Sequence, residues 1–288
     1  MRMKTQPLQN KAQRAHGLFV GRKFVALISL FIILMGASAC RSEYEKMIDK
    51  ADRELLQQKS QLAKYLYLQV LEKRKERDDV RYRALKGLAN VSATQLYEYR
   101  EAAVAFSRIF EEFGQVGQYQ VELRELRLMA SKIWRLNLER PDKALDVLTP
   151  MIEKDPFEAE FGQELGRVYV ALGDYKSASH WFSQTLEIAA NQKNCELTKS
   201  LQLDLLQVFY IQDQCGKVFE IADMKYPKGC SPDKFAINVE RANCLELTGD
   251  TAKAAEIYQE ILKNDPKNLK ALFFLEGLKR RQKQKQTK

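Results

Sequence analysis

Few side chains in this sequence could carry out acid–base, nucleophilic or metal chemistry. Its 288 residues contain two histidines, His16 and His180, and five cysteines. His180 lies beside Trp181 in a helical pattern, where it is best interpreted as a half-exposed helix-surface residue. The sequence has no His-Glu-x-x-His zinc helix, no glycine-rich phosphate loop and no Ser-His-Asp set. We therefore expect no catalytic residue, no metal site and no cofactor, and the protein is predicted not to be an enzyme.

Four of the cysteines lie in the C-terminal third of the chain, namely Cys195, Cys215, Cys230 and Cys244. Their intervals of 20, 15 and 14 residues lack the close Cys-x-x-Cys spacing that is typical of zinc sites. In an exported protein, an even number of cysteines favours disulfide bonds. The alternative is four buried free thiols that pack as small apolar side chains.

The first 40 residues have the composition of an export signal. They carry six basic side chains and no acidic one, and an apolar run extends from Phe24 to Ala39. A helix of these 16 residues would span about 24 Å, less than the ~30 Å hydrocarbon core of a bilayer. The run ends in small residues, which suit the cleft of a signal peptidase. We therefore expect residues 1–39 to be a signal peptide that is removed.

The small residues before Cys40 resemble the lipobox of bacterial lipoproteins. That resemblance implies that Cys40 is acylated and becomes the mature N-terminus, with a short linker over residues 40–43. Two or three acyl chains, at ~0.8 kcal/mol per buried methylene, hold a soluble domain on a membrane. Ordinary cleavage beside an incidental cysteine is the alternative. Because Arg41 and not aspartate follows the cysteine, the periplasmic side of the outer membrane of a Gram-negative cell is the expected location.

The positive charge of the chain is concentrated at its two ends. The net charge of the whole sequence is +9, but six basic side chains leave with the signal and six more lie in the last ten residues. Residues 41–278 therefore carry 35 of the 47 basic side chains, because 12 lie at the ends, and all 38 acidic ones. Their net charge is −3. We therefore expect no nucleic-acid partner. Residues 282–288 are interpreted as a solvated basic tail, with attraction to anionic phospholipid or an acidic partner as the alternative.

The segment EAEFGQELGRVYVALGDYKSASHWFSQTLEIAAN, residues 158–191, has small and apolar residues at fixed spacing. These residues are Leu165, Gly166, Tyr169, Gly173, Tyr175, Ala178, Phe182 and Leu186. Small residues at 166 and 178 allow two helices to approach closely, and Gly173 with Asp174 suits the turn between them. The pattern resembles the tetratricopeptide repeat, an antiparallel pair of helices that recurs about every 34 residues.

The same pattern recurs along the chain, with a second strong match at 235–268 and weaker copies elsewhere. The six candidate repeats are 44–77, 83–116, 125–158, 159–192, 199–232 and 235–268, followed by a capping helix at 269–281. No alternating β-strand pattern competes with them. The resemblance therefore implies an all-α fold, a right-handed tetratricopeptide superhelix (α-solenoid) of about six helical hairpins over residues 44–281.

The repeat geometry also implies a pairing of the four cysteines. Cys195, before the first helix of the fifth repeat, and Cys230, at the end of its second helix, would lie at the same end of that hairpin. Cys215 would lie beside the turn at the opposite end, near Cys244 in the first helix of the next repeat. We therefore expect disulfides between Cys195 and Cys230 and between Cys215 and Cys244, with free thiols as the alternative.

Proteins that resemble this family bind peptides or partner helices along the concave surface made by the first helix of each repeat. The corresponding residues here form the predicted protein-binding groove: Val91, Met129, Ile133, Leu136, Gln163, Arg167 and Tyr210. The apolar stripe of Met129, Ile133 and Leu136 suits an amphipathic partner segment. The alternative is that the register is off by one residue and that these side chains form core.

Taken with the signal, the resemblance implies a lipid-anchored periplasmic scaffold that binds proteins and is held at the membrane by acylated Cys40. Acylated repeat proteins of this size are similar to the pilotins of type IV pilus systems and to the lipoprotein subunit of the β-barrel assembly machine. We therefore expect a role in assembling an envelope machine of this kind. A regulator or adaptor of a cell-wall enzyme, which would use the same groove, is the alternative.

Overall fold

The computed structural model describes residues 42–152 and 158–286, and all of its regular elements are helical. These ranges contain thirteen α-helices, one short 3-10 turn and one π-helical turn, and they contain no strand. The predicted all-α fold is therefore confirmed. No helix in these ranges is both long and apolar enough to cross a membrane. The predicted signal peptide, Cys40, residues 153–157 of the third repeat and the last two residues of the basic tail lie outside the described residues.

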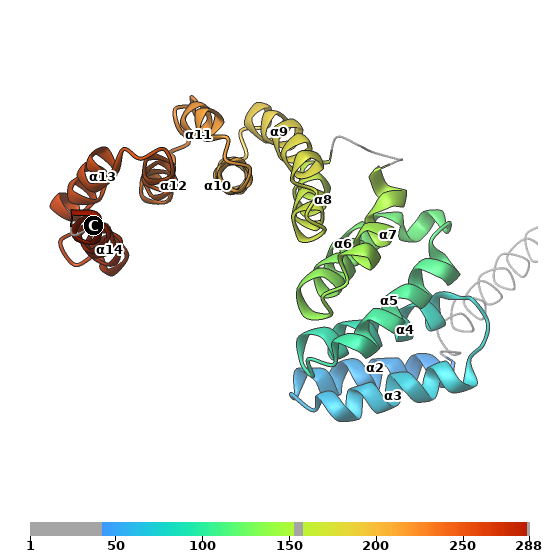
Figure 1. Cartoon of the computed structure of the whole chain (residues 1–288). Coiled ribbons are helices and arrows are strands. Elements are labelled where there is room, and N and C mark those ends of the chain that lie inside the picture. The colour runs from blue at the N-terminus through green and yellow to red at the C-terminus, as the bar shows by residue number, and fades with distance from the viewer. Residues whose placement is uncertain (1–41, 153–157, 287–288) are drawn as a thin grey trace, which may run out of the picture. The chain divides into compact units, whose positions relative to one another are not determined.

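The chain divides into two compact units, Met1–Val91 and Ser92–Lys288, and the boundary falls within a helix. The first unit contains α2 (Glu43–Leu56), α3 (Ser60–Lys73) and most of α4 (Asp79–Thr94) (Figure 1). α2 packs against α3 to form the first helical hairpin.

Local sequence explains how this first hairpin begins and how closely its helices pack. Ser42 caps α2, because its hydroxyl accepts a hydrogen bond from the Glu45 amide at 3.2 Å, and the Glu45 carboxylate accepts one from the Ser42 amide at 2.7 Å. On α3, the buried Tyr67 donates its hydroxyl proton to Asp52 of α2. A Cβ atom at Gly87 of α4 would lie only 2.4 Å from the Tyr67 ring, so glycine permits this contact.

The first part of the second unit contains one ordinary helix and one irregular hairpin. Its elements are α5 (Tyr99–Phe113), η1 (Gly117–Tyr119), α6 (Gln120–Lys132), the π-helical turn η2 (Ile133–Asn137) and α7 (Pro141–Ile152). α6 packs against both α5 and α7, and α7 contacts η2. The buried Arg127 of α6 stacks over the Phe110 ring at 4.4 Å and donates to the carbonyl of Val147 at 2.8 Å. Burial lowers the pKa of the Arg127 guanidinium.

The second part of this unit continues as helical hairpins. Its elements are α8 (Ala159–Ala171), α9 (Tyr175–Asn191), α10 (Cys195–Ile211), α11 (Cys215–Ala222), α12 (Lys234–Leu247), α13 (Thr251–Asn264) and α14 (Leu269–Gln286) (Figure 1). Each helix packs against the next one, and the first helices of successive hairpins also touch, because α6 contacts α8, α8 contacts α10 and α10 contacts α12. This pattern of neighbour contacts is typical of a solenoid.

Glycines at two kinds of position shape the α8–α9 hairpin. A Cβ atom at Gly166 would lie 2.3 Å from the ring of the buried Phe182, so glycine brings the two helices together. Gly173 has φ +78° in the turn that follows α8, a conformation that other residues adopt with strain. Asp174 then caps α9, since its carboxylate accepts from the Ser177 amide at 3.0 Å.

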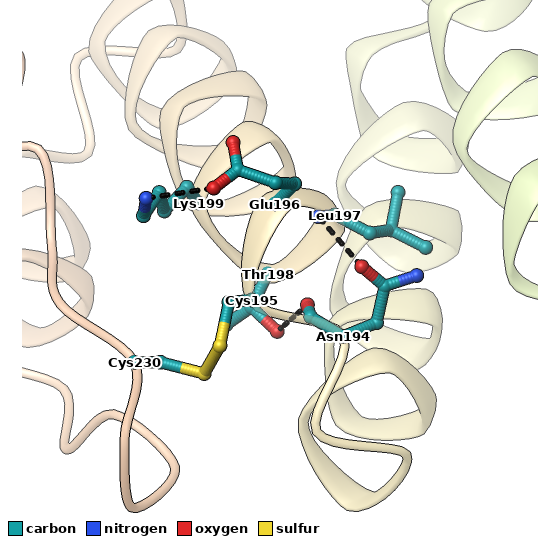
Figure 2. Close-up of a disulfide and its surroundings, with 7 residues drawn as sticks. All are labelled: Asn194, Cys195, Glu196, Leu197, Thr198, Lys199 and Cys230. Atoms are coloured by element: carbon teal, nitrogen blue, oxygen red, sulfur yellow. Dashed lines mark hydrogen bonds and ion pairs between the residues drawn. A yellow bond between two sulfur atoms is a disulfide. The ribbon is translucent and has the colours of Figure 1, made fainter.

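The hairpin of α10 and α11 is the least regular one, and two disulfides reinforce it. α11 has only 8 residues, and the segment 223–233 that follows contains Pro227, Gly229 and Pro232, which do not favour a helix. A disulfide joins Cys195, the first residue of α10, to Cys230 in this segment (Figure 2). The Tyr226 hydroxyl also bonds to Gln202 of α10, so the segment is fastened at two points.

The second disulfide joins Cys215 at the start of α11 to Cys244 of α12, and both cysteines are buried. The structure thus brings together the two expected cysteine pairs. Two expected positions need correction, because Cys195 begins α10 instead of preceding it, and Cys230 lies after α11 instead of ending it. The cause is that α10 begins at residue 195, four residues before the predicted repeat, while α11 ends early at Ala222.

Candidate partner-binding groove

The first helices of three successive hairpins, α6, α8 and α10, line a cavity of about 380 Å³, called here the polar pocket. Its lining residues are Leu128, Lys132, Glu160, Gln163, Glu164, Arg167, Asn194, Glu196, Leu197 and Ser200. Most of them carry amides, charges or hydroxyls. The pocket is therefore suited to polar groups of a ligand, such as a peptide backbone and charged side chains.

A buried carboxylate forms one wall of the polar pocket. The Glu164 side chain is 2% exposed and accepts two hydrogen bonds from Arg135 of η2, from Nε at 3.0 Å and from Nη2 at 2.9 Å. The hydroxyl of buried Ser131 donates to the same carboxylate at 3.2 Å. This bidentate pair ties α8 to the π-helical turn.

A second network connects α8 with α10 across the pocket. The Gln163 amide donates to Ser200 Oγ at 2.7 Å and to Asp204 Oδ2 at 2.8 Å. Arg167 donates from Nη2 to the same two oxygens, each at 3.0 Å. Because the Arg167 side chain remains 35% exposed, its guanidinium can also bind a group from solvent. The two helices thereby present a fixed set of donors and acceptors.

The start of α10 completes the rim of this pocket. The Asn194 side chain caps the helix by accepting a hydrogen bond from the Leu197 amide at 3.2 Å, and Thr198 donates to the Asn194 carbonyl at 2.8 Å (Figure 2). Lys199 pairs with the exposed Glu196 at 2.9 Å. The Cys195–Cys230 disulfide lies at this same turn, so it holds the residues that edge the pocket.

Of the predicted groove residues, Gln163 and Arg167 line the polar pocket, whereas others do not. Val91 and Ile133 are 1% and 5% exposed, so the prediction that they present a binding surface is wrong. Met129 is half-buried and Leu136 is 62% exposed, and neither lines the polar pocket. Tyr210 is half-buried and packs against the apolar core around α10.

The physical reason for these errors is the register of the irregular helices. On α6, Leu128 and Lys132 line the pocket, one residue before Met129 and Ile133. α6 begins at residue 120 and runs into a π-helical turn, so its side chains do not follow the spacing that a repeat starting at 125 would impose. α4 likewise begins at residue 79, four residues before the predicted start at 83, which places Val91 in the core.

Several residues of the site were missing from the prediction, notably Arg135, Glu164, Ser200 and Asp204. Two of them follow from the early start of α10, for which the sequence offers a signal. Asn194 is a favoured N-cap residue and an acidic residue, Glu196, follows in the first turn. The pairing of Arg135 with Glu164 depends on the π-helical turn, which the sequence pattern does not show.

A second cavity, of about 460 Å³, lies between α10, α12 and α14 and is called here the aromatic pocket. Its lining residues are Leu203, Gln207, Phe235, Ala236, Val239, Glu240, Leu269, Lys270, Phe273 and Phe274. Leu269 and Phe273 are 80% and 75% exposed. This pocket continues the row of first helices and is much more apolar than the first.

The described residues hold no cluster of three or more His, Cys, Asp or Glu side chains that could bind a metal ion. His180 is exposed on α9, with its ring centroid 6.0 Å from that of Trp181.

Comparisons with known proteins agree with this fold. Residues 163–192 and 223–268 each match a family model described as tetratricopeptide repeat. Among curated proteins, none matches the sequence.

Solved structures with a similar fold include YrrB, a tetratricopeptide protein with an unusual peptide-binding site, at 17% identity over 74% of this chain and 90% of that chain, with a TM-score of 0.47. Naa15/Naa10 bound to HypK-THB matches at 16% identity over 81% of this chain and 33% of that chain, with a TM-score of 0.52. Pseudomonas aeruginosa PilF matches at 16% identity over 80% of this chain and 96% of that chain, with a TM-score of 0.49. The helical hairpins define an all-α fold, and within it residues 163–192 and 223–268 match the tetratricopeptide repeat.

Proposed function

We propose that the protein is a scaffold that binds a protein partner along the row of first helices α6, α8 and α10. The observation that carries this proposal is the polar pocket, where Gln163 and Arg167 of α8 meet Ser200 and Asp204 of α10. Tetratricopeptide repeats are typically non-catalytic and bind segments of other proteins with this type of surface. The exposed Lys132 and the half-buried Arg167 would bind carboxylates or carbonyl oxygens of the partner.

Site-specific photo-crosslinking in cells tests this proposal. A photo-reactive amino acid replaces Glu196, which is exposed and lines the polar pocket, or Glu187, which is exposed on α9 away from the pocket. We expect one protein to be crosslinked strongly at position 196 and not at 187. We also expect Lys132→Glu to reduce that crosslink severalfold, because it reverses a charge at the rim. Equal crosslinking at both positions, or none at 196, would contradict the proposal.

The finer proposal is that this scaffold is lipid-anchored in the periplasm and helps to assemble an envelope machine, such as a pilus secretin or the outer-membrane protein assembly apparatus. Its support is the sequence before residue 42: a basic segment, an apolar run and small residues directly before Cys40. α2 begins at Glu43, so an acyl group on Cys40 would hold the first hairpin within a few residues of the bilayer.

Metabolic labelling with radioactive palmitate tests the anchor. We expect the wild-type chain to incorporate label and to enter the detergent phase, and Cys40→Ser to lose both properties while remaining folded. Arg41→Lys, which keeps the cysteine, serves as the matched control and should label normally. A labelled Cys40→Ser variant, or a mature protein that begins at a residue other than 40, would refute acylation at this site.

A further inference from the structure

The aromatic pocket combines three phenylalanine rings with a single carboxylate. Phe235 of α12 and Phe273 and Phe274 of α14 line it, and among the described residues Glu240 is the one acidic side chain in its lining. The Phe274 ring stacks on the buried Tyr258 with centroids 5.3 Å apart, and the Phe273 ring meets Phe274 edge-on at 5.9 Å. The Phe274 ring is thus held by the core, while Phe273 remains largely exposed.

The Glu240 carboxylate is oriented by a hydrogen bond to one of its oxygens, and its other oxygen can accept a hydrogen bond from a ligand. Asn243 donates to its Oε2 at 3.2 Å, and the Tyr258 hydroxyl donates to Asn243 at 3.5 Å. Among the described residues, no cationic side chain pairs with Glu240 and no partner contacts its Oε1. Burial raises the pKa of the Glu240 carboxyl, because a half-buried charge without a counter-ion is poorly solvated. A bound cation would supply the missing compensation.

Aromatic ring faces attract cations, and a carboxylate beside them adds direct ionic pairing. We propose that the aromatic pocket binds the side chain of a lysine or arginine in the partner segment, with apolar neighbours of that residue resting on Leu269 and Phe273. This inference rests on the proposed scaffold function and names the chemistry of the partner. It differs from the polar pocket, where Lys132 and Arg167 are proposed to bind oxygen atoms of the partner.

In the part of the chain that the structure describes, Lys270 is the one basic residue of the lining, and its substitution tests whether the pocket prefers a positive or a negative ligand group. It lies in the first turn of α14 and is exposed, so water screens its repulsion of a bound cation. Removing this charge should strengthen binding of a basic side chain modestly. Removing the charge of Glu240 should weaken it.

Panning a phage library of random dodecapeptides on the purified full-length chain tests the inference. We expect the selected peptides to share a lysine or arginine beside leucine or phenylalanine. The synthetic consensus peptide should lose about tenfold in affinity when its basic residue becomes glutamine. Acidic or purely apolar consensus peptides, or no selected peptide, would overturn the inference.

Variants of the protein assign any such binding to this pocket. Phe273→Ala, at an exposed position, and Glu240→Gln, which keeps the size of the side chain, should each lower affinity for the consensus peptide by about tenfold. Lys270→Met should raise it about twofold. Leu272→Ala changes a neighbouring residue outside the pocket and should leave affinity unchanged.

Wild-type affinity in Glu240→Gln and Phe273→Ala would refute this site. If the partner crosslinked at position 196 is still bound by these two variants, only the aromatic-pocket inference fails. If the chain that carries the photo-reactive residue at 196, and no other substitution, crosslinks no protein, the scaffold proposal itself is refuted.

Discussion

Replacing Glu164 by alanine is expected to lower the free energy of unfolding by about 3–5 kcal/mol. The carboxylate is 2% exposed and the Arg135 side chain 13% exposed, so the substitution leaves a largely buried guanidinium without its counter-ion. The buried hydroxyl of Ser131 loses its acceptor as well. Denaturant unfolding followed by circular dichroism measures the change.

Two comparisons separate this effect from a simple loss of volume. Arg140→Ala removes a bidentate pair with Asp142 whose partners are about half exposed, and it should change stability little. The double variant Glu164→Leu with Arg135→Met replaces both charges by apolar groups and should recover much of the lost stability. A Glu164→Ala variant as stable as wild type would show that the buried pair is not formed.

Removing the Cys215–Cys244 disulfide by substituting alanine for both cysteines is expected to cost about 3–4 kcal/mol in the free energy of unfolding. The bond closes a loop of 29 residues, and without it the unfolded chain gains conformational freedom. Both cysteines are buried, so alanine leaves small cavities in addition. Denaturant unfolding of the variant and of the wild type, both without reductant, measures this loss; the wild type in reductant, which opens both disulfides, should lose more.

The pair of Cys195 and Cys230 provides the comparison, since its loop of 35 residues predicts nearly the same chain-entropy cost. Its loss should have a further effect, because Cys195 begins the turn of α10 that edges the polar pocket. Crosslinking at position 196 should therefore decrease when Cys195 and Cys230 are both replaced by alanine. It should stay unchanged when Cys215 and Cys244 are replaced by alanine. Four thiols that react with an alkylating agent in denaturant without reductant would refute both disulfides.

The accuracy of the sequence-based prediction depended on how regular each hairpin is. For 159–192 the spacing of small and apolar residues places α8 at its observed start, and from that start Gln163 and Arg167 fall on the pocket-lining face. Packing enforces this regularity, because a Cβ atom at Gly166 would collide with Phe182. The fold and the centre of the polar pocket could therefore be predicted.

Elsewhere, the repeat spacing misplaced side chains. On α6, the pocket-lining residues are Leu128 and Lys132, one position before Met129 and Ile133, and Ile133 therefore lies in the core. The aromatic pocket was missed for another reason. Its rings come from α12 and α14, which are separated in sequence by α13, and only packing shows that Glu240 and Phe273 line one cavity.

Helix α10 is common to both pockets. Ser200 lines the polar pocket and Leu203 the aromatic one, and three residues of helix advance only about 4.5 Å along the axis. One continuous partner segment can therefore reach both cavities, so that the second contact forms at the high local concentration created by the first. Two weak contacts on one partner segment would then give a high overall affinity. A competitor that carries only an acidic group or only a basic group would bind one pocket, and the bivalent partner would displace it.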